Sequence, residues 1–600
     1  MRRRREGTSA KGQVSRGERS RAGVLRRSSL NTQSSTARRG SALIIVLIVI
    51  VFLTLGAYTF LDSMILERRA ADFSARTAQS RALADSGIEY AAAKLGKPAD
   101  LATENIYHNP TMFSGIVLLE STSTTERGRF SLVAPLENDT SGTQLRYGLV
   151  DESSKININA ISALGLTSDQ EHALMMSVPG MTDEIADSIL DWVDADEEAR
   201  TNGAESDSYQ TGESGHPAKN GACESLDELL LVKGVTPELL YGEDANRNGL
   251  LDANENDGEL TPPLDNQDGK LNLGWNAYLT VYSRESNLQY DGTERINANQ
   301  PVLAELYDEL EEEFGAEIAT FVTAYRLMGP VTPSALKTAS NTTSTGDADA
   351  DDVIGQVAAG ITQQVTRAAT GTGGTGSTGA GNAAADPVLK GGMDLSAGAK
   401  MNIASLYELV DAQVTVTIDK TSKTLDSPWA SGSLSTTLPT LLEKMTTSTA
   451  TTIDGRININ QARKEILQGI PNMPTGLPDL IAKEQVIQDG QPNADAITER
   501  ATTGWLLSKG LVKLEEIQLL DKYICARGDV FSMQSVGGFD RGGATIRIEA
   551  VIDATKKPPQ VVFRRDLTHL GPGYRVDQLF VPDATATPTA ISAPTATATK

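Results

Sequence analysis

The residues best suited to chemistry lie in a loop rich in Asp and Asn, DANRNGLLDANE at 244–255. Oxygen-bearing side chains stand at the first, third, fifth, ninth and twelfth positions and a glycine at the sixth, as in loops that wrap a calcium ion. The backbone carbonyl of the seventh residue completes such a ligand set. The sequence therefore predicts a calcium site formed by Asp244, Asn246, Asn248, Leu250, Asp252 and Glu255.

An alternative interpretation of this loop is a solvated turn, because Asn and Asp are common in turns that bind nothing. The flanking residues also do not form two clean amphipathic helices. The prediction therefore covers the loop and not a complete EF-hand domain.

The other reactive residues give catalysis little support. No two histidines lie at metal-ligand spacing and neither cysteine has a histidine beside it; the histidines are His108, His172, His216 and His569. The Gly-rich stretch 371–381 lacks the lysine of a phosphate-binding loop. We therefore expect that the protein is not an enzyme. Cys223 and Cys525 are either two free thiols or one long-range disulfide, and the sequence leaves both possibilities open.

Charge is distributed unevenly along the 600 residues. The formal net charge is -24, yet residues 1–40 hold twelve basic and two acidic residues, so this leader carries +10 and the remainder -34. An acidic body disfavours phosphate backbones and anionic membrane surfaces, whereas it suits divalent cations. Calcium is therefore the cofactor that we expect.

A charge-free apolar run from Ser41 to Leu61 follows the leader and ends before Asp62. Its length is about the 20 residues that a helix needs to cross a bilayer, and the basic leader favours a cytoplasmic N-terminus. Residues 62–95 contain no proline and many good helix formers. We predict a single-pass membrane helix that continues outside the bilayer to residue 95.

Beyond this helix, one short pattern recurs: a basic residue, then apolar, Asn and apolar positions. It occurs as KININA, RINANQ, KMNIAS and RININQ at 155–160, 295–300, 400–405 and 456–461. Each copy is typical of a short strand or turn that leads into a helix. In the first copy, Thr182 resembles the N-cap of a helix over 182–193, after a turn at 178–181. This pattern predicts helix-hairpin-helix arrangements.

Alternating segments typical of strands lie at both ends of the body, at 115–121, 128–135, 146–150, 544–553 and 560–565. The helical segments between them would then be insertions into one β head. We predict an α+β fold with a long N-terminal helix and an antiparallel head interrupted by helical domains of the helix-hairpin-helix or SAM-like type.

These expectations divide the chain into consecutive parts. They are a basic leader (1–40), a membrane helix (41–61), the soluble half of that helix (62–95), the first part of the head (96–150), a helical insert with acidic calcium-type loops (151–330), a low-complexity linker (331–395), a second helical insert (396–526), the last part of the head (527–582) and a disordered tail (583–600).

The junction RRGSALIIVL at 38–47 resembles the processing site of prepilins, in which a prepilin peptidase cuts after the glycine. The resemblance implies that Gly40 and Ser41 form the processing site and that Ser41 is the mature N-terminus. A signal anchor without processing is the alternative. Most pilins carry a glutamate at the fifth mature position, where this chain has Ile45.

An apolar start without this acid resembles the family of minor pseudopilin K of type II secretion systems (general secretion pathway protein K). So do the stretches YGLVDESSKININA, SILDWVDADEEARTNGAESDSY, ESLDELLLVKGVTPELLYG, GWLLSKGL and DVFSMQSVGG. The family implies calcium in the helical domain. A second candidate metal site then comprises Asp191, Asp194, Asp196, Glu205 and Asp207, with a solvated acidic loop as the alternative.

The resemblance implies a subunit that caps the pseudopilus tip and supports protein secretion across the envelope. Its partners would be minor pseudopilins I and J, the prepilin peptidase, the inner membrane and, as a further candidate, secreted cargo; nucleic acid is not expected. The body would be periplasmic. The alternative is a membrane-anchored, competence-type DNA receptor, but acidic residues follow the hairpin turn and would repel phosphates. A calcium-dependent adhesin would leave the glycine-bordered membrane helix unexplained.

Overall fold

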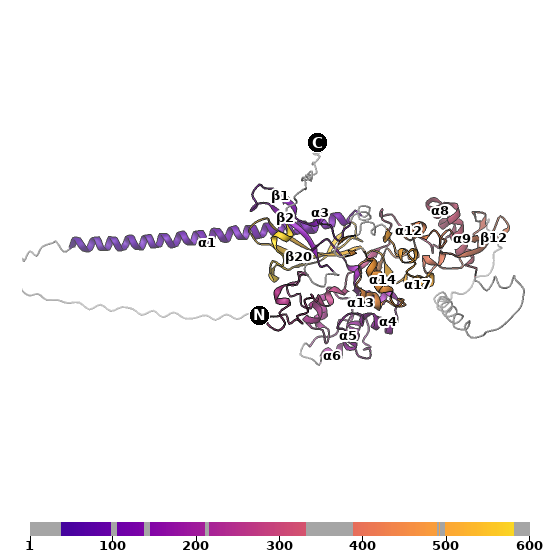
Figure 1. Cartoon of the computed structure of the whole chain (residues 1–600), viewed down its shortest axis with the longest axis horizontal. Coiled ribbons are helices and arrows are strands. Elements are labelled where there is room, and N and C mark those ends of the chain that lie inside the picture. Colours follow the sequence, from indigo (N-terminus) through magenta and orange to yellow (C-terminus); the bar gives the residue numbers. More distant parts are fainter. Residues whose placement is uncertain are drawn as a thin grey trace, which may run out of the picture. The chain divides into compact units, whose positions relative to one another are not determined.

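The computed structural model describes residues 38–97, 105–136, 144–210, 215–331, 388–485, 487–488, 491–492 and 499–580. The chain forms two compact units, Met1–Asp72 and Phe73–Lys600. The boundary falls within the first helix, α1 (Arg38–Leu95), which Figure 1 draws in indigo. The predicted tail and most of the predicted leader and linker lie outside the described residues.

The first unit contributes the apolar part of α1. Its large apolar side chains from Leu43 to Leu66 are exposed, as expected of a surface that faces lipid. Among the described residues, one helix, Ala42–Leu95, is long and apolar enough to cross a membrane. Its length and composition are compatible with a single-pass anchor.

The second unit is built on a seven-stranded antiparallel sheet with the strand order β1-β2-β19-β20-β21. Two short strands join the sides of this path, β3 on β2 and β4 on β19. The strands are β1 (Ile116–Leu119), β2 (Gly128–Ala134), β3 (Arg146–Tyr147), β4 (Val150–Asp151), β19 (Val530–Phe539), β20 (Ile546–Asp553) and β21 (Gln560–Asp566). The short helices α3 (Pro110–Phe113) and α18 (Val576–Leu579) accompany the sheet.

The C-terminal part of α1 packs on this sheet (Figure 1). Ala84, Ile88 and Ala91 share a core with Phe130 and with apolar residues of β19 and β20. Two glycines permit the close approach. A Cβ at Gly87 would lie 2.2 Å from Oγ of Ser535, and a Cβ at Gly537 would lie 2.3 Å from the backbone nitrogen of Ala84.

The long segment between β4 and β19 forms three inserts, each closed by a short pair of parallel strands. The first insert (156–281) is closed by β5 (Ile156–Asn157) and β6 (Leu279–Thr280), the second (296–447) by β8 (Ile296–Asn297) and β13 (Met445–Thr446), and the third (457–526) by β15 (Ile457–Asn458) and β18 (Ile524–Cys525). A further antiparallel pair, β7 (Arg284–Ser286) and β14 (Thr452–Asp454), joins the segments between the inserts.

The second asparagine of the copies at 155–160, 295–300 and 456–461 explains why these three copies fold alike. Its side-chain amide donates to the carbonyl one residue beyond the partner strand: Asn159 to Val281, Asn299 to Thr447 and Asn460 to Ala526. The same amide also reaches a loop of its own insert, at Cys223, Ile403 and Arg500 respectively. In each of these copies, the asparagine therefore holds the two ends of one insert together by hydrogen bonds.

The inserts carry the remaining elements. The first has α4 (Ser168–Met175), α5 (Asp183–Val193), α6 (Ser206–Gln210) and α7 (Pro237–Tyr241). The second has α8 (Leu303–Phe314), α9 (Ala316–Met328), β9 (Leu389–Lys390), β10 (Met393–Asp394), β11 (Gln413–Ile418), β12 (Thr421–Asp426) and α12 (Leu434–Lys444). The third has α13 (Lys464–Gly469), α14 (Leu477–Glu484), β16 (Ile487–Gln488), β17 (Gln491–Pro492), α16 (Trp505–Ser508) and α17 (Leu514–Leu520).

The predicted α+β class is confirmed, but the structure divides the helical part differently from the predicted boundaries at 330 and 396. Residues 296–331 close on 445–446 and belong with 388–447, because β8 pairs with β13. Residues 389–394, predicted as linker, form the hairpin β9–β10. The motif at 400–405 is not a copy: Ile403 instead supplies the loop that Asn299 binds.

Candidate metal centres

Three acidic side chains of the first insert converge on one point. Asp194, Asp196 and Glu205 each place a carboxylate oxygen within 4.8 Å of the others. Among the described residues, this is the one group of three such side chains close enough to hold a metal ion together. Asp194 caps the C-terminus of α5, and Glu205 directly precedes α6. The turn between these helices therefore brings together residues that are separated in sequence.

Three of the carboxylate oxygens of this group lack protein partners. Oδ1 of Asp194 and both carboxylate oxygens of Glu205 are buried without a hydrogen bond, and Glu205 is only 6% exposed. Burial, reinforced by the neighbouring carboxylates, raises the pKa of Asp194 to about 6 and that of Glu205 to about 7. Unpaired buried carboxylates are costly unless a cation neutralises them, and oxygen donors suit calcium. The residues present therefore fit a hard divalent cation.

The other two residues predicted for this site do not join the group. Asp191 is fully buried and accepts the backbone N–H of Arg200, whose Nε lies 3.5 Å from its Oδ1. Asp207 is exposed in the first turn of α6. Arg200, which we did not predict, also binds Glu171 of α4 at 2.6 Å and so ties the acidic loop to the helix pair. Its only sequence signal is a lone basic residue in an acidic run.

The raised pKa values of Asp194 and Glu205 predict how stability depends on pH. Without a cation, the folded chain holds these protons more tightly than the unfolded chain, so the free energy of unfolding should fall as pH rises from about 4 to about 7. Cation binding displaces the protons, so calcium affinity should rise over the same range. Unfolding curves in EDTA and calcium titrations at several pH values test both trends. Equal pH slopes for the wild type and Glu205→Gln would contradict this assignment.

The loop predicted at 244–255 is stabilised by its own polar groups. Asp244 is buried and accepts the backbone N–H groups of Asn248 and Gly249 at 2.9 and 2.8 Å. The N–H of Leu250 donates to Oδ1 of Asn248 at 2.6 Å, and the amide of Asn246 donates to Asp252 at 2.6 Å. These contacts turn the polar side chains toward one another.

Some features of this loop fit a cation site and others do not. Burial raises the pKa of Asp244 to about 6 and that of Glu255 to about 7, and Glu255 is raised further by Asp244 and Asp252. Oδ1 of Asn246 is buried without a partner. Both oxygens of Glu255 accept backbone N–H groups, from Ala245 and Asp252. The loop therefore offers a cation fewer unpaired acceptors than the group at Asp194 does.

Neither the predicted processing site nor the two cysteines, for which a disulfide was one of two interpretations, form part of these centres. Gly40 and Ser41 lie near the start of α1. Cys223 and Cys525 are both free and buried, so the disulfide interpretation is wrong. The physical reason is their placement, since Cys223 lies in the loop bound by Asn159 and Cys525 in β18 of the third insert. Burial raises the pKa of Cys223 to about 12 and makes this thiol unreactive.

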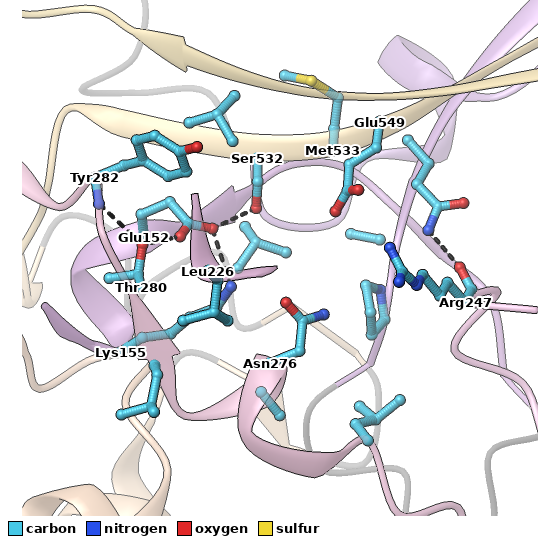
Figure 2. Close-up of a pocket in the computed structure, with 18 of the residues that line it drawn as sticks. Glu152, Lys155, Leu226, Arg247, Asn276, Thr280, Tyr282, Ser532, Met533 and Glu549 are labelled. Atoms are coloured by element: carbon cyan, nitrogen blue, oxygen red, sulfur yellow. Dashed lines mark hydrogen bonds and ion pairs between the residues drawn. The ribbon is translucent and has the colours of Figure 1, made fainter. Parts of the chain in front are cut away.

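A cavity of about 120 Å³ lies where the first insert meets the head sheet (Figure 2). Glu152 reaches into it and binds Lys155 at 3.0 Å together with Thr280 and Ser532. Glu549 and Arg247 approach from β20 and from the calcium-type loop (Figure 2). Apolar as well as polar side chains line the cavity, and the carboxylate of Glu152 within it already has hydrogen-bond partners.

The fold is of the class that the prepilin resemblance implied: an apolar helix that continues onto an antiparallel sheet with helical inserts. Residues 154–241 match the family model described as "Type II secretion system (T2SS), protein K". This region contains α4 to α7 and the carboxylate group, and over it the predicted resemblance to the protein K family is confirmed.

The structure is also similar to one titled "The Crystal Structure of the GspK-GspI-GspJ complex from enterotoxigenic Escherichia coli Type 2 Secretion System". The match has 10% sequence identity, a TM-score of 0.29, and covers 83% of this chain and 97% of that chain. No curated protein matches the sequence significantly.

Proposed function

We propose that this chain is the K-type minor pseudopilin that caps the pseudopilus of a type II secretion system and supports secretion across the envelope. The observation that carries this proposal is the family match over residues 154–241. The apolar α1 supports it as the part that anchors the subunit in the inner membrane, with the N-terminus cytoplasmic and the body periplasmic.

The size of the inserts supports a position at the tip. They occupy the chain between β4 (Val150–Asp151) and β19 (Val530–Phe539), far more than the sheet itself. A subunit with so large an insertion does not repeat easily in a tight helical fibre, but it can end one. Ile45 agrees with a terminal subunit, because a carboxylate at that depth costs about 2.5 to 3.5 kcal/mol without a partner.

We infer minor pseudopilins of types I and J as partners, because the resemblance to protein K implies them and the solved complex described above contains GspK together with GspI and GspJ. Co-purification of the full chain with minor pseudopilins of types I and J from the same organism tests this inference. Recovery of the chain alone from detergent extracts in which both are present would contradict it.

Processing gives a direct test of the membrane part of the proposal. We expect the mature chain from membranes to begin at Ser41, and this N-terminus to disappear when the prepilin peptidase is inactive. Mass spectrometry of the N-terminal peptide measures this. The control is Gly40→Ala, which should block the cut. An intact leader in all three samples would leave a plain signal anchor and contradict the proposal.

Calcium is the cofactor that we propose, held by Asp194, Asp196 and Glu205 and by the loop 244–255. A ligand that binds only the folded chain stabilises it by about 2.7 kcal/mol at a hundred times its Kd. Chelation should therefore lower the melting temperature of the wild type, and Glu205→Gln should lose much of this response. Asp207→Asn is the matched control, because Asp207 is exposed and outside the group. Identical melting curves with EDTA and with calcium would remove calcium from the function.

A further inference from the structure

The calcium-type loop 244–255 is bound from outside by the head sheet, although the two are about 300 residues apart in the chain. Nη2 of Arg547, in β20, donates to the carbonyls of Asn246 at 2.8 Å and Arg247 at 3.1 Å. Gln534, in β19, donates to the same carbonyl of Arg247. The amide of Asn248 donates back to the carbonyl of Gly573 at 2.7 Å.

These donors hold a backbone conformation that the loop would not favour alone. Arg247 has φ 56°, in the left-handed region that residues other than glycine seldom adopt. Its carbonyl points at Arg547 and Gln534 as a result, and Asn246 turns its carbonyl the same way. With the carbonyls directed outward, the carboxylates of Asp244 and Asp252 and the unpaired Oδ1 of Asn246 remain within the loop.

The sheet residues that do this are themselves fixed. Arg547 is fully buried, and its Nη2 also donates to Oε1 of Gln534 at 3.2 Å. The hydroxyl of Tyr574 donates to the same oxygen at 3.0 Å. Leu250 packs against the small apolar cluster that contains Tyr574. Arg247 itself lies at the cavity between the insert and the sheet (Figure 2).

We propose that Arg547 and Gln534 are positioning residues for the loop 244–255: they hold it in the conformation that binds a cation. Cation binding by the loop and docking of the first insert on the head sheet are therefore coupled, and each strengthens the other by the same factor. This inference rests on the proposed calcium binding by the same loop.

The charge of Arg547 makes the test sharp, because electrostatics alone predicts the opposite result. A guanidinium close to Asp244 repels a cation, so its removal should raise calcium affinity if Arg547 acted only through charge. If Arg547 positions the loop, its removal should lower the affinity instead. Gln534 carries no charge, so its replacement reports positioning alone.

The experiment is calcium titration of the full chain in detergent, in a Glu205→Gln background that weakens the other centre. We expect Arg547→Met and Gln534→Ala each to weaken calcium binding by about tenfold. Arg575→Met is the control, because Arg575 is exposed and its partner Asp577 lies outside the loop. We also expect calcium to slow amide exchange in β19 and β20 of the background chain, and this effect to vanish in Gln534→Ala.

The outcomes separate the two proposals. If the Glu205→Gln chain binds no calcium at the loop, both the calcium proposal for this loop and the coupling fail. If it binds calcium, and Gln534→Ala and Arg547→Met bind equally well or more tightly, the coupling alone is wrong. Should Arg547→Met fail to fold, Gln534→Ala and Tyr574→Phe decide, since both keep the buried arginine.

Discussion

Gly537→Ala should lower the free energy of unfolding of the head by about 3 kcal/mol. A Cβ at Gly537 would lie 2.3 Å from the backbone nitrogen of Ala84 and 2.4 Å from the carbonyl oxygen of Ser80. Both atoms belong to the backbone of α1, so no rotamer change relieves the contact. The helix must move away from β19, and the core that includes Ile88 and Phe130 loosens with it.

Hydrogen exchange of amides in β19 and β20 measures this effect directly. Tryptophan fluorescence would not report it, because the tryptophans all lie in the inserts and not in the head. Gly432→Ala is the matched control. Gly432 is exposed, and a Cβ there would have nothing within 4 Å, so we expect a change within about 0.5 kcal/mol. Equal protection in the two variants would mean that α1 does not pack on the sheet as described.

Glu285→Leu should destabilise the inserts by about 3 kcal/mol, because it leaves Arg456 without its carboxylate in the interior. Oε1 of Glu285 lies 3.0 Å from Nη1 of Arg456, and their side chains are 9% and 21% exposed. Glu285 lies in β7, and Arg456 directly precedes β15. The pair therefore links the segment after the first insert to the start of the third.

Tryptophan fluorescence in urea reports this change, since Trp275, Trp429 and Trp505 are buried in the three inserts. The double variant Glu285→Leu with Arg456→Leu should recover part of the loss, which a double-mutant cycle converts into a coupling energy. Asp577→Asn, in an exposed pair with Arg575, should change stability by less than about 0.5 kcal/mol. Strictly additive single variants would show that the ion pair contributes nothing.

The two predictions concern contacts on which the proposed role depends. In the proposed role a membrane helix carries a large head, and Gly537 lies where the C-terminal part of that helix meets the sheet. The inserts must in turn keep their places on the head, which the link between Glu285 and Arg456 and the docked loop 244–255 favour. Stability at these contacts is therefore a condition for the function that we propose.

The sequence alone determined the features that depend on local composition. The unbroken run of helix formers to residue 95 predicted α1, which ends at Leu95. Thr182 was predicted as an N-cap, and its hydroxyl accepts the N–H of Ile185. Alternation predicted the two strands on either side of β19, β2 (Gly128–Ala134) and β20 (Ile546–Asp553), within two residues. These signals are short-range, so a single sequence contains them.

Only the tertiary structure decided features that depend on distant partners. The central strand β19 was missed because Gly537, Gly538 and the polar residues of this strand hide its alternation. Gly537 is required by a distant partner, since a side chain there would collide with the backbone of α1. The boundaries of the inserts follow from which strand each Asn-containing copy pairs with, as β8 does with β13.

The same reason divided the candidate site. The sequence suggested five carboxylates as ligands, but the fold brings only Asp194, Asp196 and Glu205 together. Asp191 instead accepts a hydrogen bond from Arg200. No pattern in residues 244–255 predicts their contact with Arg547, because that contact joins residues about 300 positions apart in the chain. Ligand types are a property of the sequence, whereas their convergence and the residues that hold them are properties of packing.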